Sequence, residues 1–167
     1  MPSVKAGFAS MSEVHSFTIF ADYFQFIVQD ELSDDDFSAI WTPDALANGT
    51  AFGRQAICPG TLRNVDVAVD VVISETEPLM NLAAVDHAVE GSIELPSGNV
   101  VVMGCTQYFP DAPRFKIRAG VYRVLAVMTG IATISNEWDP ADDKYLVYLW
   151  PGTHRDPKLL KHWKADA

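Results

Sequence analysis

The sequence predicts an all-β protein, an antiparallel β-sandwich of jelly-roll-like form with one or two short helices. Three observations favour this fold class. Short segments rich in aromatic and β-branched residues recur along the chain, several of them alternate polar and apolar residues, and turn-forming residues separate them. A closed β-barrel is the alternative, because the same pattern of strands and turns can close on itself.

Strands are expected at 17–20, 23–28, 65–73, 87–95, 100–103, 114–117, 121–128 and 145–150. The first two segments are rich in aromatic and β-branched side chains, which favour strands. A period of two marks 65–73 and 87–95, so each of these strands is expected to bury one face. Pro96-Ser97-Gly98-Asn99 is a turn, and we expect it to join the strands on either side of it as a hairpin.

Two short helices are expected. Thr42-Pro43-Asp44 combines a capping residue, a proline suited to the first helical position and an acid in the first turn, and Asn48-Gly49 supplies a stop. The second helix is expected at 157–163, where two leucines and Trp163 fall on one face and two lysines on the other.

The length of 167 residues fits a single domain over 1–167, with a core at about 14–151 and a tail at 153–167. Hydrophobic residues make up 49% of the chain, and no run of about 18 apolar residues is present, so we expect no transmembrane helix. The first residues contain one lysine and no apolar run, so we expect no secretory signal peptide and a cytoplasmic protein.

No catalytic, cofactor-binding or metal-binding motif is found, so we expect no enzyme and no cofactor. The four histidines form no metal-ligand pattern, and His87 is expected to be a hydrogen-bonded core residue. Cys58 and Cys105 are expected to be buried or half-buried thiols, with a bridge possible only between neighbouring strands. The run Asp34-Asp35-Asp36 lacks the spacing of a calcium loop, so a solvated charge run is favoured over a cation site.

The formal net charge of −10 disfavours direct binding to nucleic acid or to anionic membranes and favours a basic partner. Acidity also keeps proteins soluble, so the position of the charges matters more than their number. The segment from Asp30 to Asp44 has six carboxylates and no lysine or arginine. Apolar anchors rimmed by charge are typical of a protein-binding patch. The candidate partner-binding residues are Asp34, Asp35, Asp36, Phe37, Trp41 and Asp44. The alternative, which is compatible with binding, is that Phe37 and Trp41 cover an open end of the sandwich.

Several segments resemble the competence protein J family. The resemblance begins with Tyr23-Phe24-Gln25-Phe26 and Trp41-Thr42-Pro43-Asp44-Ala45, followed by Gly49, and continues through Phe115 to Tyr122 and Tyr145-Leu146-Val147. It covers about 17–150, with the segments in the same order and at comparable spacing. The sequence differs from the family in its longer amino end and in its basic, tryptophan-bearing tail.

The resemblance implies a small protein that binds and inhibits a DNA-degrading nuclease. The residues that carry it are interpreted as fold determinants: Tyr23, Gln25, Trp41, Asp44, Gly120 and Tyr122. A second hypothesis is a small-ligand binding β-sandwich, or an enzyme built on one. Its end pocket would be lined by Tyr23, Trp41, Phe52, Tyr108 and Tyr122.

Overall fold

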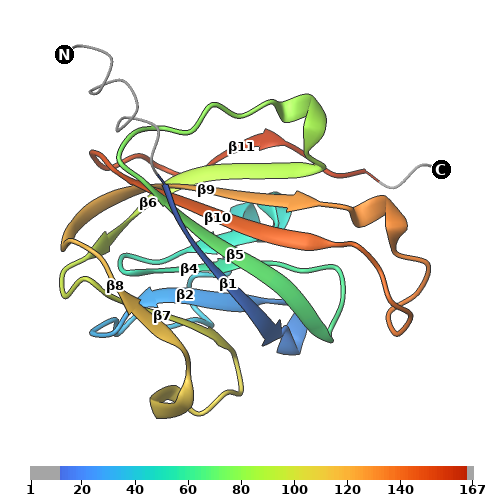
Figure 1. The fold of residues 1–167 in the computed structure, drawn as a ribbon, viewed down its shortest axis with the longest axis horizontal. Helices are drawn as coiled ribbons and strands as arrows, with labels where there is room; N and C mark the ends of the chain where they lie inside the picture. Colours follow the sequence, from blue (N-terminus) through green and yellow to red (C-terminus); the bar gives the residue numbers. More distant parts are fainter. Residues whose placement is uncertain (1–11, 165–167) are drawn as a thin grey trace, which may run out of the picture.

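Two β-sheets face each other in the computed structural model (Figure 1), which describes residues 12–164. The six-stranded sheet has the order β1 (Ser12–Phe20), β5 (Asp66–Ser74), β10 (Lys144–Pro151), β9 (Gly120–Thr129), β6 (His87–Leu95), β11 (Lys158–Lys161). The five-stranded sheet has the order β3 (Thr50–Phe52), β4 (Ala56–Pro59), β2 (Phe26–Asp30), β7 (Asn99–Gly104), β8 (Arg114–Lys116). The predicted sandwich is confirmed. Both sheets keep open edges over the described residues, so the closed-barrel alternative is wrong.

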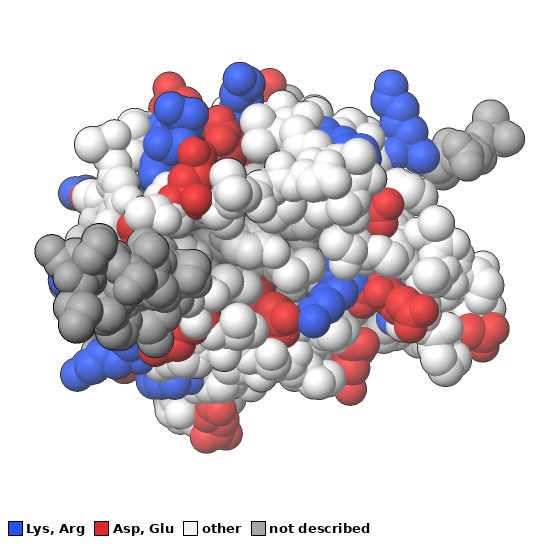
Figure 2. Space-filling view, turned by 45° about the horizontal axis from the view of Figure 1, so that its top comes forward, with Lys and Arg blue, Asp and Glu red and all other residues white. Residues whose placement is uncertain are grey.

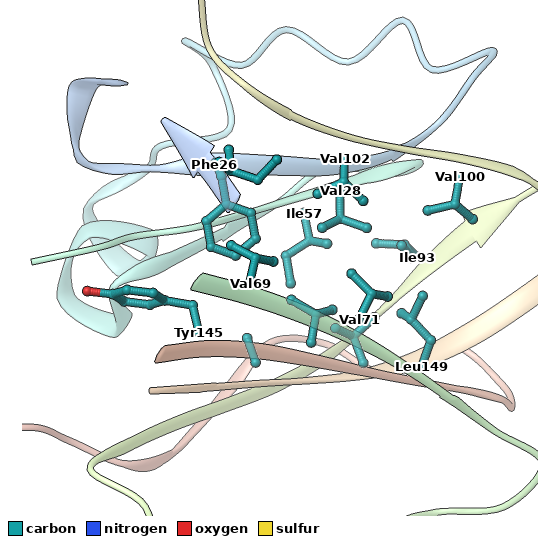
Figure 3. Close-up of a cluster of buried hydrophobic side chains, with 14 of the residues drawn as sticks. Phe26, Val28, Ile57, Val69, Val71, Ile93, Val100, Val102, Tyr145 and Leu149 are labelled. Carbon is teal, nitrogen blue, oxygen red and sulfur yellow. The ribbon is translucent and has the colours of Figure 1, made fainter. Parts of the chain in front are cut away.

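Strand pairing is antiparallel throughout the described sheets except between β10 and β5, which run parallel. The core lies between the two sheets (Figure 3), where Phe26 and Val28 of β2 face Val69 and Val71 of β5. The alternation in 65–73 is thereby explained, because every second residue of β5 from Val67 to Val71 points into this core. Burying a side chain of this size stabilises the fold by about 1.5–3 kcal/mol.

The turn at 96–99 forms as predicted, but the hairpin prediction is wrong. β6 pairs with β9 and β11, whereas β7 pairs with β2 and β8, so the turn carries the chain from one sheet to the other. The buried carboxylate of Asp30 holds this turn, accepting hydrogen bonds from the amide and the hydroxyl of Ser97 at 3.0 and 2.9 Å. A period of two indicates a strand but does not specify its partner.

The strand predicted at 23–28 begins later than expected. Residues 22–24 form a 3-10 turn, η1 (Asp22–Phe24), and the strand β2 starts at Phe26. Tyr23 and Phe24 both have a φ of 59°, which is incompatible with an extended strand. The prediction from aromatic content therefore placed the start of this strand too early. The three remaining 3-10 turns of the described chain are η2 (Leu82–Ala84), η3 (Phe109–Asp111) and η4 (Ile131–Thr133).

The helix predicted at 157–163 is wrong. Residues 158–161 form the edge strand β11 instead, which pairs with β6. The open edge of β6 supplies backbone hydrogen bonds that outweigh the weak helix propensity of so short a segment. The ammonium of Lys161 donates to the carbonyl of Leu82 at 2.8 Å, and Trp163 packs against the main core. Residues 165–167 of the predicted tail lie outside the described residues. So do residues 1–11, which include most of the segment in which no signal peptide is expected.

The helix α2 (Pro43–Asn48) confirms the capping pattern. The hydroxyl of Thr42 accepts a hydrogen bond from the amide of Ala45 at 3.2 Å, and Gly49 ends the helix in the left-handed region with a φ of 78°. The side chain of Asp44 lies in the first turn, as expected. No helix within residues 12–164 is long and apolar enough to cross a membrane. The single-domain prediction for 1–167 stays a prediction.

Candidate binding surface around helix α2

Three carboxylates of the acidic segment stabilise local structure. Asp30 is fully buried and holds the turn at 96–99. Asp35 accepts hydrogen bonds from the amides of Arg54 and Gln55 at 2.9 and 2.8 Å, so it ties the segment to the β3–β4 turn. Asp36 accepts a hydrogen bond from the amide of Ser38 at 2.9 Å. The predicted acidic run is thus only partly available to a partner.

Asp34 and Asp44 differ from these residues. Both side chains are exposed, and neither takes part in a hydrogen bond or ion pair with the described residues. Glu31 is paired with Arg114, with 2.7 Å between Oε1 and Nη1. The acidic segment therefore offers Asp34 and Asp44 as its unpaired charges.

The large apolar residues of the segment cover the outer face of the five-stranded sheet. Phe37, Ile40 and Trp41 are half-buried, and they pack on a second apolar cluster that includes Ile27 and Met103. The indole N–H of Trp41 donates to the side-chain oxygen of Gln25 at 2.7 Å, which fixes the ring against β2. Phe37 and Trp41 therefore cover a face of the sheet and not the open end of the sandwich considered from the sequence, and partner binding by them stays a proposal.

A hollow of about 330 Å³ lies on one side of α2, and we call it the aromatic hollow. Its lining residues are Tyr23, Phe24, Gln25, Trp41, Leu46, Gly49 and Gly60. Three of the large apolar side chains are strongly exposed: Tyr23 by 69%, Phe24 by 48% and Leu46 by 67%. Grouped apolar side chains in such exposed positions mark interaction sites more often than scattered ones do.

The pocket predicted from five aromatic residues is assembled only in part. Tyr23 and Trp41 meet in the aromatic hollow. Phe52 packs against the main core, and Tyr122 is buried with its hydroxyl donating to the carbonyl of Arg118 at 2.6 Å. Tyr108 is exposed and lies outside the hollow. The five rings therefore do not line a common pocket.

The turn η1 presents two of these side chains in a strained backbone conformation. Tyr23 and Phe24 are non-glycine residues in the left-handed region, where each costs on the order of 1–3 kcal/mol. Surrounding contacts hold them there. The amide of Phe24 donates to the carbonyl of Ala21 at 3.1 Å, and the carbonyl of Phe24 accepts from the amide of Thr61 at 2.8 Å. Asp22 accepts a hydrogen bond from the hydroxyl of Thr106 at 2.9 Å.

A second hollow of about 590 Å³ lies on the other side of α2, and we call it the acidic hollow. Asp44 and Asp156 are its charged lining residues, and no lysine or arginine lines it. Ile40, Phe52 and Pro157 supply apolar surface. A cationic side chain from a partner would be favoured here by charge, although both carboxylates are well exposed and screened by solvent.

The face of the molecule in Figure 2 has a different character. Lysine and arginine side chains are interspersed with aspartate and glutamate there, and a broad area between them carries no charge. The acidic excess of the chain is not gathered on this face. The acidic hollow beside α2, lined by Asp44 and Asp156 without lysine or arginine, differs from this face.

His154 contacts a hydroxyl and a carboxylate. Ser92 lies 3.2 Å from Nδ1 of His154, whose Nε2 lies 3.0 Å from Asp156, which resembles a nucleophile triad in residue type. However, the hydroxyl of Ser92 donates to the carbonyl of Arg155 and accepts from its amide, both at 2.9 Å. We therefore assign Ser92 to anchoring the chain that follows β10. No group of three or more metal-ligating side chains is arranged as a metal site within residues 12–164.

His87 is a hydrogen-bonded core residue, as predicted, with 5% of its surface exposed. Its Nε2 donates to the carbonyl of Asn48 at 2.5 Å, and its Nδ1 accepts from the amide of Trp163 at 3.0 Å. These two partners require the neutral ring with the proton on Nε2. Cys58 is buried and Cys105 half-buried, both thiols are free as favoured from the sequence, and burial raises the pKa of each.

Sequence reasoning missed Phe24 and Leu46 as parts of the site. Phe24 was interpreted as a strand residue, and no local sequence signal indicates a left-handed conformation for an aromatic residue. Leu46 had a usable signal, because a short capped helix with Ala45 on its buried face exposes the next position.

The architecture defines the class of this protein as a sandwich of the competence protein J type, which confirms that resemblance at the level of the fold. The crystal structure of ComJ from Bacillus subtilis, an inhibitor of the DNA-degrading activity of NucA, matches with a TM-score of 0.65 and 16% identity, covering 86% of this chain and 100% of that chain. A structure of Crocagin biosynthetic gene J matches with a TM-score of 0.62 and 18% identity, covering 86% and 99% of the two chains. No protein-family model and no curated protein sequence matches the chain.

Proposed function

We propose that this protein is a non-catalytic, cytoplasmic inhibitor that binds a basic partner, a DNA-degrading nuclease. The observation that carries the proposal is the shared fold with ComJ over 86% of the chain, because ComJ is an inhibitor of a DNA-degrading activity. Fold alone does not determine function, so the binding surface must supply the rest of the argument.

The charge of the surface around α2 supports the same proposal. A nuclease holds a polyanion and therefore tends to have a basic active face. Asp44 and Asp156 present exposed carboxylates in the acidic hollow beside α2, Asp34 is exposed in the segment that precedes the helix, and the chain has a net charge of −10. An acidic surface steers a basic partner and competes with DNA for the same face. The residues proposed to contact the partner are the candidates Asp34, Asp35, Asp36, Phe37, Trp41 and Asp44.

A nuclease assay tests the proposal directly. Purified NucA from Bacillus subtilis, and any nuclease recovered with the tagged chain from its source cell, would be incubated with linear DNA and increasing amounts of the native chain. We expect a stoichiometric loss of DNA degradation that weakens as salt is raised, because screening reduces charge-directed association. Unchanged degradation by both nucleases, at a large excess of the folded chain, would contradict the proposal.

A further inference from the structure

We propose that the aromatic hollow receives an apolar side chain that projects from the basic face of the nuclease partner. This inference rests on the proposed inhibitor function and deepens it by assigning the anchoring site. The occupant is a large apolar residue of the partner flanked by lysine or arginine. The residues that contact it are Tyr23, Phe24, Trp41 and Leu46.

Apolar side chains that line the aromatic hollow are exposed to solvent. Tyr23 and Leu46 are exposed by 69% and 67% although they face the same hollow from different elements, η1 and α2. Single exposed apolar residues are common on soluble proteins, but three around one hollow are not scattered. Binding energy in protein interfaces concentrates in such aromatic-lined depressions, which exclude water when an anchor residue enters.

Hydrogen bonds hold the walls of the aromatic hollow in place. The indole of Trp41 is fixed by its hydrogen bond to Gln25, and the carbonyl of Phe24 is fixed by the amide of Thr61. The neighbouring amide of Leu62 donates to the hydroxyl of Tyr145 at 3.1 Å. The walls are therefore preorganised, and a partner would lose little free energy in ordering them.

The charge around the aromatic hollow is complementary to that of a basic partner. The residues that line the hollow include no lysine and no arginine. Asp22 adjoins Tyr23 in the chain, and the chain as a whole carries a net charge of −10. An apolar anchor flanked by cationic side chains therefore meets apolar surface in the hollow, on a protein whose net charge is negative. An acidic partner would be repelled by the same arrangement.

The strained backbone of Tyr23 allows a test that separates binding from stability. Asparagine tolerates the left-handed region better than tyrosine does, so Tyr23→Asn relieves strain while it removes the aromatic ring. We expect Tyr23→Asn to raise the melting temperature and to weaken inhibition of NucA at least about 30-fold, the loss typical of a hot-spot residue. Replacing a residue that only maintained the fold would lower both the melting temperature and the strength of inhibition.

Leu46→Ser is the second variant, and Leu79→Ser is its matched control. Leu79 is fully exposed and lies between β5 and β6, outside the hollow. Inhibition constants and melting temperatures would be measured for all variants alongside the native chain. We expect Leu46→Ser to weaken inhibition about 10-fold or more with little change in melting temperature, and Leu79→Ser to match the native chain.

The possible outcomes separate the two proposals. If the native chain inhibits and Tyr23→Asn and Leu46→Ser inhibit equally well, the aromatic hollow is not the anchoring site and the inhibitor function stands. If Leu79→Ser weakens inhibition as much as Leu46→Ser does, the effect is not local and the assignment is overturned. If the native chain inhibits neither NucA nor the recovered nuclease, the proposed function fails and the assignment fails with it.

Discussion

The helix α2 and the turn η1 line the same hollow, but they are specified in different ways. Each local feature of α2 favours a helix: the Thr42 cap, the proline that follows it and the left-handed Gly49 at its end. The turn η1 places Tyr23 and Phe24 where non-glycine residues rarely lie. Its conformation depends on contacts with segments distant in sequence, at Thr61 and Thr106.

This difference shows where functional constraint is concentrated. A sequence specifies a structure when its local preferences agree with the fold, and departures from that agreement are expected at functional or strained sites. The strain in η1 persists because the surrounding structure determines the conformation. Under the proposed binding function, selection for binding accounts for the strained turn, whereas local folding preferences account for α2.

The largest expected effect comes from removing the support beneath the turn. The loop that binds the carbonyl of Phe24 continues to Arg63, whose guanidinium pairs with Asp143 at 2.6 Å in a buried position. Asp143→Ala leaves the charge of Arg63 buried without its partner. We expect the free energy of unfolding to fall by about 3–5 kcal/mol, measured by urea denaturation.

The exposed pair of Arg54 and Glu94 provides the control for this prediction. Glu94→Ala breaks an ion pair whose side chains are 76% and 41% exposed, so we expect a loss below about 1 kcal/mol. Similar losses for Asp143→Ala and Glu94→Ala would show that the buried pair does not support the turn more than a surface pair does.

A smaller loss of stability is expected for the helix α2, the element specified by local preferences. Thr42→Ala removes the cap of α2, and we expect the free energy of unfolding to fall by about 1 kcal/mol. Thr42→Ser keeps a hydroxyl in the capping position, so it should recover most of the loss. Denaturation curves of the two variants measured together test whether the helix is specified locally. An equal loss for both would contradict the role of the cap.

Much of the fold was predictable because it follows from local preferences. The boundaries of α2 and the strand with alternating valines between Val65 and Ile73 depend on short-range patterns. The pairing of β6 with β11 and the crossing at 96–99 depend on which sheet edges are free, and a sequence pattern does not contain that information. The tail illustrates the point, because its leucines fit a helical face and also fit the edge of β6.

The candidate site was less predictable than the fold. The acidic run was identified, but its residues serve different purposes: Asp35 binds backbone amides, whereas Asp34 is exposed and unpaired within the described chain. The aromatic hollow combines Tyr23, Trp41 and Leu46 from separate elements. Their proximity depends on a distant segment, because the amides of Gly60 and Thr61 bind the carbonyls of Gly49 and Phe24.

A pH dependence is expected from the contact between His87 and the tail. Burial lowers the pKa of His87 below its ordinary value of 6.5; the hydrogen bond to Asn48 opposes this shift and His162 adds to it. Between the lowered pKa and 6.5 the unfolded chain binds more protons than the folded chain does, so the free energy of unfolding rises with pH in that window. Stability is thus fully present above 6.5 and is lost as the pH falls through the lowered pKa.

Denaturation at a series of pH values checks this prediction. Protonation of Nδ1 also removes the acceptor for the amide of Trp163, so the protection of this amide, its exchange rate measured against the intrinsic rate at the same pH, should fall as the pH falls. His154 lies in an exposed position, and His154→Gln is the control that should keep the native pH profile. A profile that persists in His87→Gln would assign the effect to another group.

The smallest effect is expected from a single charge of the acidic segment, and it depends on the proposed inhibitor function. Asp34 is exposed and makes no contact that its loss would break, whereas Asp35 receives the amides of Arg54 and Gln55. Asp34→Asn should leave the melting temperature unchanged and slow association with the nuclease by less than an order of magnitude at about 10 mM salt, where charges act over about 30 Å. The difference should vanish near 1 M salt, where that range falls to about 3 Å.

Asp35→Asn should instead lower the melting temperature, because an amide side chain replaces a carboxylate that accepts two backbone hydrogen bonds. Stopped-flow association rates and melting curves for both variants separate steering from folding. Equal association rates for Asp34→Asn and the native chain at low salt would remove Asp34 from the steering surface.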